Sequence, residues 1–356
     1  CEILIMWGGY AGMEKIKELF LNKKEKSWKS ILLDWAIYIV LLLLVLVIIY
    51  IDPKFLSLKN ASAILSQAST RIILALGVSG IVVLGCTDLS LGRSVGMAAI
   101  FTASLLQDPS YGSRVFPNLP ELPVIIPILG AVVLCTLFSL IHGFFVAKLK
   151  VAPFIASLGM QLVIYGLMSI YFDVVNNSAP IGVLNPKFSN LAQGAFMIGS
   201  VRIPYLVCYA VIMIGIIWFI WNKTVLGRNM FAIGGNSEAA NVSGINIIKN
   251  MLLIYLIAGI LYGIGGSLEV ARTGSATNAL GQSYELDAIA SCVVGGVSMR
   301  GGVGSIGGVV TGVLLFQIIS YGLVFAQVNP YLQYFVKGAI ILLAVAVDTQ
   351  KYIKKK

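Results

Sequence analysis

The sequence predicts an all-α membrane protein with about ten transmembrane helices, some of them broken or re-entrant. Apolar residues make up 58% of the 356 residues and charged residues only 11%, whereas soluble proteins average roughly 25% charged residues. The apolar residues occur in long runs separated by short loops. Glycine is abundant at 37 residues, which suits closely packed and interrupted helices in a bilayer.

A helix needs about 20 apolar residues to cross a bilayer. Candidate spans lie near 31–51, 62–85, 93–107, 124–147, 152–172, 205–222, 251–268, 285–297, 304–325 and 332–348. An even number of spans leaves both termini on one side, and the lysines that flank the first and last spans mark that side as cytoplasmic. We therefore expect a cytoplasmic leader at 1–30, a transmembrane domain at 31–349 and a basic cytoplasmic tail at 350–356.

The net charge of +10 is explained by these flanking lysines and by basic residues in short loops, so we expect no nucleic-acid partner. The five cysteines and the single histidine, His142, show no metal-ligand spacing. We expect no metal site, and we interpret His142 as a packed helix residue. Residues 1–12 are expected to be a start-site artefact before Met13, with a lipidated Cys1 as the alternative.

Three apolar stretches are short or interrupted by glycine: 93–107, 285–297 and 295–308. Such segments are typical of broken helices, which occur in membranes only where protein or a water-filled cavity satisfies the exposed backbone. The segments "LSLGRSVG" at 89–96 and "VSMRGGVG" at 297–304 are similar. They suggest a two-fold internal repeat, although glycine-rich segments also resemble one another by chance.

Two polar segments embedded between apolar runs are candidates for a translocation pathway, because charges within a membrane are costly and usually functional. The first, Gly85–Arg93, could instead be a loop in which Asp88 caps the next helix. The second, Glu269–Gly308, offers hydrogen bonds to a hydroxylated solute, but could be an exposed loop and a helix pair. Arg71 either pairs with a carboxylate inside the bundle or extends to an interface. The pathway candidates are Thr87, Asp88, Ser90, Arg93, Glu269, Arg272, Asn278, Gln282, Glu285 and Asp287.

The loop Leu226–Asn250 is expected to carry a short helix along the cytoplasmic membrane face. Asn236 or Ser237 can cap this helix, and Glu238 suits its positive N-terminal end. Such a helix, held by a glycine turn, is a suitable contact for another subunit. The contact candidates are Gly235, Asn236, Ser237, Glu238, Ala239, Ala240 and Gly244.

Several catalytic motifs are missing from the sequence. It contains no G-x-x-x-x-G-K-[ST] phosphate loop, so this chain cannot hydrolyse ATP by that chemistry. It also lacks H-E-x-x-H, G-x-S-x-G and paired catalytic His and Cys residues. We therefore expect a chain that is not an enzyme and has no catalytic residues.

Long stretches of the chain resemble the ribose/galactose branch of the ABC sugar-importer permeases. The stretches are "STRIILALGVSGIVVLGCTDLSLGRSVGMAA", "KVAPFIASLGM", "WNKTVLGRNMFAIGGNSEAANVSGIN" and "GSATNALGQSYELDAIASCVVGGVSMRGGVGS". The resemblance runs from about residue 31 through nearly the whole chain. It is closest to the galactose/methyl-galactoside members, chiefly through "TDLSLGR" and "GSATNALG", because ribose-type members usually lack an arginine at the position of Arg93.

This resemblance implies an inner-membrane homodimer surrounded by lipid and the import of galactose, glucose or methyl galactoside. It implies two ATPase subunits that carry ATP and Mg²⁺, while this chain binds no cofactor, and a periplasmic or lipid-anchored sugar-binding protein. The helix around Gly235–Gly244 would contact the ATPase. Ribose, xylose and nucleosides are alternative substrates. A secondary transporter driven by an ion gradient is the other alternative, with Asp34 and Asp88 as its candidate carboxylates.

Overall fold

The computed structural model describes Leu43, residues 45–50, 52–199 and 201–353, with the backbone alone from residue 347. The chain divides into two compact units, residues 1–43 and 44–356, and the fold below is that of the second. The expected leader at 1–30, the start-site artefact at 1–12, the candidate Asp34, most of the span at 31–51 and the last three residues of the tail lie outside the described residues.

The described residues are mainly helical, and nine helices match nine of the ten expected spans. These helices are α3 (Leu58–Val83), α4 (Leu91–Leu105), α5 (Ile125–Ala147), α6 (Pro153–Asn176), α8 (Tyr205–Lys223), α11 (Ile247–Thr273), α12 (Tyr284–Val294), α13 (Ile306–Phe325) and α14 (Pro330–Ile353). Among the described residues, six helices (α3, α5, α6, α8, α11 and α13) are long and apolar enough to cross a membrane, and α4 and α14 contribute shorter apolar stretches. The predicted all-α membrane fold is confirmed.

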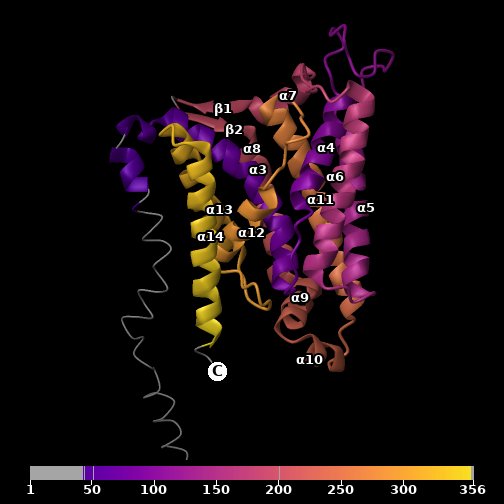
Figure 1. The fold of residues 1–356 in the computed structure, drawn as a ribbon, viewed down its shortest axis with the longest axis vertical. Helices are drawn as coiled ribbons and strands as arrows, with labels where there is room; N and C mark the ends of the chain where they lie inside the picture. The colour runs from indigo at the N-terminus through magenta and orange to yellow at the C-terminus, as the bar shows by residue number, and fades with distance from the viewer. Residues whose placement is uncertain (1–42, 44, 51, 200, 354–356) are drawn as a thin grey trace, which may run out of the picture. The chain divides into compact units, whose positions relative to one another are not determined.

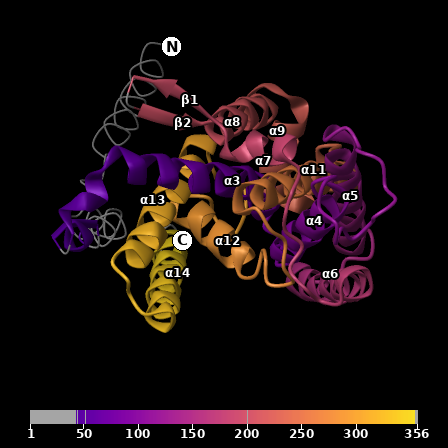
Figure 2. The same ribbon diagram turned by 90° about the horizontal axis from the view of Figure 1, so that it is seen from above.

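Helices α3 and α11 form the centre of the bundle. Helix α11 contacts α3, α4 and α5, and in Figure 2 α3 and α11 lie between α5 and α6 on one side and α13 and α14 on the other. In the apolar windows of α3 and α11, 83% and 67% of the residues are buried, against 22–28% in α5, α6 and α8. Since the surface left open on α5, α6 and α8 is apolar, it suits contact with lipid.

Smaller elements cover the two ends of the bundle. The α7 end carries the 3₁₀ helix η1 (Pro53–Leu56), α7 (Pro186–Gln193) and a hairpin of β1 (Ala195–Ile198) and β2 (Val201–Pro204), while the α10 end carries α9 (Val225–Gly235) and α10 (Ser237–Val242) (Figure 1). The strands pair antiparallel from Ala195 opposite Pro204 to Ile198 opposite Val201. The stretch 173–204, between two of the expected spans, therefore contains the end of α6, a short helix and a hairpin that was not predicted.

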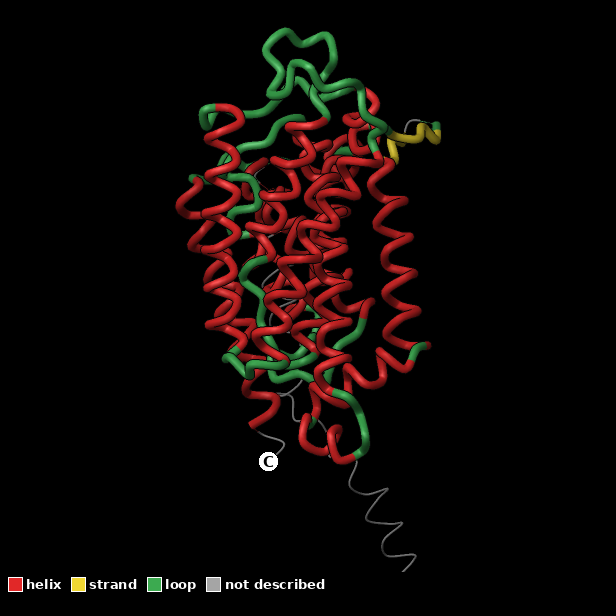
Figure 3. Tube along the Cα trace, turned by 90° about the vertical axis from the view of Figure 1, so that its right-hand side faces the viewer, coloured by secondary structure: helices red, strands yellow, loops and turns green. Residues whose placement is uncertain are grey.

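The predicted broken helices are confirmed at α4 and α12. Helix α4 has 15 residues and α12 has 11, which is too short for a hydrocarbon core of about 30 Å at 1.5 Å per residue. Non-helical backbone at 84–90 and 295–305 precedes α4 and follows α12, and Figure 3 shows loop segments inside the bundle. The bundle buries most of 84–90, as a membrane environment requires, whereas in 295–305 only Val297, Ser298 and Gly301 are buried.

The same backbone turn ends α3 and α12. After α3 the amide of Cys86 donates to Ile81 O at 3.1 Å, and after α12 the amide of Val297 donates to Cys292 O at 2.9 Å. The residues between, Gly85 and Gly296, have φ of +77° and +84°, a conformation that glycine adopts without steric cost. These two glycines allow each helix to stop sharply and the chain to continue as extended backbone.

Candidate functional site

Asp88 lies at the centre of a buried polar cluster. Its side chain is 0% exposed, and its Oδ1 accepts hydrogen bonds from the Ser90 amide at 2.9 Å and the Ser90 hydroxyl at 2.6 Å. The Tyr262 hydroxyl of α11 donates to Oδ2 at 3.0 Å, and His142 Nδ1 of α5 lies 3.5 Å from Oδ1. Thr87 is half-buried beside it. Asp88 therefore joins the broken segment to two long helices, and Ser90, not Asp88, stands at the N-cap position of α4.

His142 is a packed helix residue, as the sequence analysis expected. It is fully buried, and its ring meets the ring of Tyr255 edge-on with 4.9 Å between the centroids. The interplanar angle of 74° is the arrangement that aromatic pairs favour. His142 thus forms the α5 side of the Asp88 cluster.

Glu269 forms a second buried cluster, nearer the α7 end of α11. The carboxylate is 0% exposed and accepts hydrogen bonds from Arg272 at 2.8 and 3.1 Å, Thr70 at 2.7 Å and Tyr284 at 2.8 Å. Arg71 Nη2 lies 3.9 Å from the carboxylate. A buried charge is tolerated when it is paired and hydrogen-bonded in this way, so the cluster fixes α3, α11 and α12 together.

Arg71 pairs with a carboxylate inside the bundle, which was the first of its two interpretations. In addition to the contact with Glu269, its guanidinium lies over the ring of Tyr284 with Cζ 3.1 Å from the centroid. Stacking of this kind suits the flat guanidinium group. The Arg71 side chain is therefore held between α11 and α12.

The third polar group lies near the first turns of α4. The guanidinium of Arg93 lies over the Tyr165 ring at 4.3 Å and donates to Asn278 O at 3.4 Å, and the Asn278 amide donates to Ser169 Oγ at 3.1 Å. Glu285 is buried, and its carboxylate would overlap any Cβ added at Gly92, the second residue of α4. Its negative charge thus lies at the positive end of the α4 dipole.

The fourth polar group joins α12 to α14. Lys337 Nζ lies 3.0 Å from Asp287 Oδ2, and both side chains are about one-fifth exposed. Gln282, in the turn before α12, is exposed nearby and lines the same cavity as these two side chains. Lys337 was not among the predicted pathway residues, although a lysine within the apolar run 332–348 was itself a signal.

The expected short helix in the loop 226–250 is present as α10. The Asn236 side chain accepts a hydrogen bond from the Ala239 amide at 3.0 Å, so Asn236 and not Ser237 is the cap, and Glu238 lies in the first turn. Ala240 is buried, and Gly244, with φ +83°, follows the helix. Ser237, Glu238, Ala239 and Gly235 are exposed, as is Val242, which is 90% exposed at the end of α10. The α10 helix therefore presents an open polar and apolar surface.

The end of α9 meets the last residue of α3 and the segment 295–305 at Gly234 and Gly302; we call this the glycine junction. The Gly302 amide donates to Val83 O, at the end of α3, at 2.8 Å. A Cβ at Gly234 would overlap Val83 O and lie 2.6 Å from Gly302 N, whereas a Cβ at the neighbouring Gly235 would meet nothing within 4 Å. The main chains of α9, α3 and the segment 295–305 are thus in direct contact.

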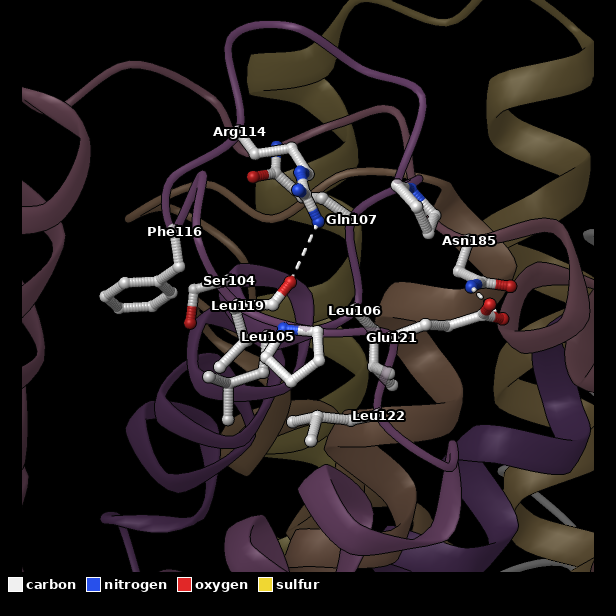
Figure 4. Close-up of a pocket in the computed structure, with 12 residues that line it drawn as sticks. Ser104, Leu105, Leu106, Gln107, Arg114, Phe116, Leu119, Glu121, Leu122 and Asn185 are labelled. Carbon is white, nitrogen blue, oxygen red and sulfur yellow. Dashed lines mark hydrogen bonds between the residues drawn. The ribbon is translucent and has the colours of Figure 1, made fainter.

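The loop 106–124 is a compact cap at the α7 end. Figure 4 shows the Arg114 guanidinium turned toward Leu119 O, which it meets at 3.2 Å, and the Asn185 amide beside the Glu121 carboxylate. Lys187 Nζ lies 2.9 Å from Glu121, and its charge and hydrogen bond hold the pKa of Glu121 below the ordinary value. Arg114 folds the loop back on itself, and the contact of Glu121 with Lys187 joins the loop to α7.

The ten predicted pathway residues therefore form four neighbouring groups. Thr87, Asp88 and Ser90 form one, Arg93, Asn278 and Glu285 another, Glu269 and Arg272 a third, and Gln282 and Asp287 a fourth. Sequence reasoning missed Thr70, Tyr262, Tyr284 and Lys337 as members. The described residues contain no group of three or more His, Cys, Asp or Glu side chains that could hold a metal ion.

Apolar helices around buried charge clusters and interrupted helices define a multi-pass membrane protein of the transporter type. The chain belongs to the family described as "Branched-chain amino acid transport system / permease component", whose pattern matches residues 60–345. It is therefore a multi-pass permease of the inner membrane.

The chain is similar to named permeases over nearly its whole length. It is 52% identical over 336 residues to a galactose/methyl galactoside import permease protein of Escherichia coli, covering 94% of this chain and 99% of the relative. The protein of that description in Haemophilus influenzae is 51% identical, again over 94% and 99%. A ribose import permease protein of Escherichia coli is 34% identical over 92% of this chain and 96% of the relative. No solved structure matches the chain.

Proposed function

We propose that this chain is the membrane-spanning subunit of an ABC importer that moves galactose or methyl galactoside into the cell. The observation that carries the proposal is the identity of 52% to a galactose/methyl galactoside permease across both chains. Identity to the ribose permease is 34%, which makes ribose the second candidate. The family description mentions branched-chain amino acids, but the similar full-length relatives transport sugars by name.

The α10 end faces the cytoplasm in this proposal. Basic residues gather there and beside it, at Lys148, Lys150, Lys223, Arg228 and Lys249, as the positive-inside rule requires. Both termini lie on the same side. The α7 end then faces the sugar-binding protein, and a second copy of the permease completes the transport unit.

The ATPase partner binds the exposed surface of α10. Glu238 gives this surface a negative charge, and Val242 is an exposed apolar side chain at the end of α10. ATP and Mg²⁺ belong to the partner. This chain contributes no catalytic group and is not an enzyme.

Movement of α10 reaches the pathway through the glycine junction. Because Gly234 contacts both Val83 and Gly302 through main-chain atoms, displacement of α9 moves the ends of α3 and of the segment 295–305 together. The two broken segments then open or close the pathway toward the cytoplasm. This is alternating access driven from the α10 end.

Labelled galactose uptake into proteoliposomes tests the proposed function. The assay contains the permease, the ATPase encoded with it and the corresponding sugar-binding protein, with either ATP or an ion gradient as the energy source. Uptake that requires ATP and both partners supports the proposal. Galactose uptake driven by an ion gradient through the permease alone would establish the secondary-transporter alternative and would make Asp88 the first residue to replace.

A further inference from the structure

A cavity of about 310 Å³ lies between the start of α12 and the first half of α14. Its polar and aromatic walls include Gln282, Tyr284, Asp287, Gln333, Tyr334 and Lys337. This volume lies near the lower end of the roughly 300–1,000 Å³ that small-molecule sites occupy. The cavity therefore has room for one monosaccharide-sized solute.

Each charged side chain that lines the cavity has a partner of opposite charge, and Glu269, the partner of Arg71, also pairs with Arg272. Asp287 and Lys337 form an ion pair at 3.0 Å, and Arg71, which also lines the cavity, lies 3.9 Å from Glu269. A free anion or cation would leave one of these charges without its partner, which is costly at low dielectric. These pairings favour a neutral solute that offers both donors and acceptors.

Arg71 adds a fixed donor that is not fully used. Its Nη1 is buried and has no hydrogen-bond partner among the described residues, while stacking on Tyr284 fixes the guanidinium plane. A buried donor without a partner is unfavourable, so a hydroxyl oxygen that reaches it is favoured. An apolar solute or a lipid tail would not satisfy it.

Aromatic surface completes the cavity. Tyr334 is 64% exposed and lies one helical turn before Lys337, so that its ring and the ammonium group share one face of α14. A pyranose has an apolar C–H face and a rim of hydroxyls, which match a tyrosine ring and the neighbouring charged groups respectively.

We propose that this cavity is a transient subsite for a neutral hexopyranose on its way through the membrane. Asp287 accepts from sugar hydroxyls, Lys337 and Arg71 donate to them, and Tyr334 packs against the ring. The ion pair reforms when the sugar leaves, which keeps the subsite weak enough to release its solute. The inference rests on the proposed function and adds a defined binding position to it.

The first test is protection of an introduced cysteine from a maleimide by galactose in the full-length permease in nanodiscs. Tyr334→Cys places the thiol in the cavity, and Tyr331→Cys is the matched control, because Tyr331 is exposed on the same helix but does not line the cavity. Labelling of the unsubstituted chain is subtracted. Millimolar galactose should slow labelling of Tyr334→Cys at least threefold and leave Tyr331→Cys unchanged.

Other outcomes of the protection assay separate the two proposals, because it needs neither ATP nor partners. Protection by leucine and not by galactose would overturn both the sugar subsite and the proposed substrate. Equal labelling with and without galactose, in a permease that imports galactose with its partners, would overturn the subsite alone.

The second test separates sugar binding from a purely structural ion pair. We expect Asp287→Asn to raise the galactose concentration for half-maximal uptake about tenfold. The exchanged pair, Asp287→Lys with Lys337→Asp, keeps the attraction but reverses donors and acceptors toward the sugar, so uptake should stay impaired. Full uptake by the exchanged pair would show that the residues only join α12 to α14.

Discussion

At the scale of single residues, the two buried carboxylates differ in how their charges are balanced. Glu269 faces two guanidinium groups, of Arg71 and Arg272, and two hydroxyls. Asp88 is held mainly by hydroxyl and amide donors and has a single histidine beside it. Removing either carboxylate therefore has a different consequence for the groups left behind.

Replacing Glu269 with alanine should strongly destabilise the folded protein. The change leaves Arg71 and Arg272 without a counter-charge inside the bundle, and breaking such a buried pair costs about 3–5 kcal/mol. Thermal unfolding of the purified chain in detergent measures the loss. Glu238→Ala is the control, because this carboxylate is exposed on α10; equal midpoints for the two variants would contradict the assignment.

Tyr262→Phe should weaken the Asp88 cluster without creating a large cavity. It removes one hydroxyl donor to a charged acceptor at 3.0 Å, and such a bond contributes about 1.5–3 kcal/mol. The same thermal measurement should show a lower midpoint. Tyr209→Phe removes a hydroxyl that makes no hydrogen bond to Asp88, and a midpoint reduced as much in that variant would argue against a specific role for Tyr262.

At the scale of elements, the glycine junction joins α9 to the end of α3 and to the segment 295–305. Gly234→Ala should disrupt it, because the added methyl overlaps Val83 O, whereas Gly235→Ala has free space around it. We expect at least a tenfold loss of galactose uptake in the first variant and near-normal uptake in the second. Uptake rates are compared at equal amounts of folded permease, and equal rates would show that α9 does not transmit movement there.

Glu238→Lys should uncouple transport from ATP hydrolysis. It reverses the charge in the first turn of α10, where a carboxylate favours the helix dipole, and changes the surface offered to the ATPase. Membrane insertion should stay intact while galactose uptake falls. Immunoblots of membranes and uptake assays measure the two quantities, and unaltered uptake would remove α10 from the coupling pathway.

At the scale of the whole molecule, the sequence predicts the fold well and the site less completely. Hydropathy located nine of the described helices, and short glycine-cut runs identified the breaks at α4 and α12. Charges in apolar runs marked Asp88 and Glu269. Their partners were harder to find, because Thr70 and Glu269 are 199 positions apart and pairing depends on how the helices pack.

Two features were missed for identifiable reasons. The strands of the hairpin at Ala195–Pro204 have four residues each, which is too short for a periodic pattern. The apolar residues around Lys337 outweigh its single charge in the mean hydropathy of the last span, so its pairing with Asp287 was not predicted. Both features depend on contacts in the folded structure, which the local composition of the sequence does not reveal.

Arg71 and Glu269 are far apart in the sequence, and this has a consequence for how the chain is inserted into the membrane during translation. Translation presents α3 to the insertion machinery long before α11, so the Arg71 guanidinium at first has no carboxylate beside it. An arginine at the centre of a helix costs about 2.5–3.5 kcal/mol during insertion. In a nascent chain that stops before residue 269, α3 therefore holds an unpaired arginine in lipid. The earlier helices reach their final positions only after α11 has been synthesised.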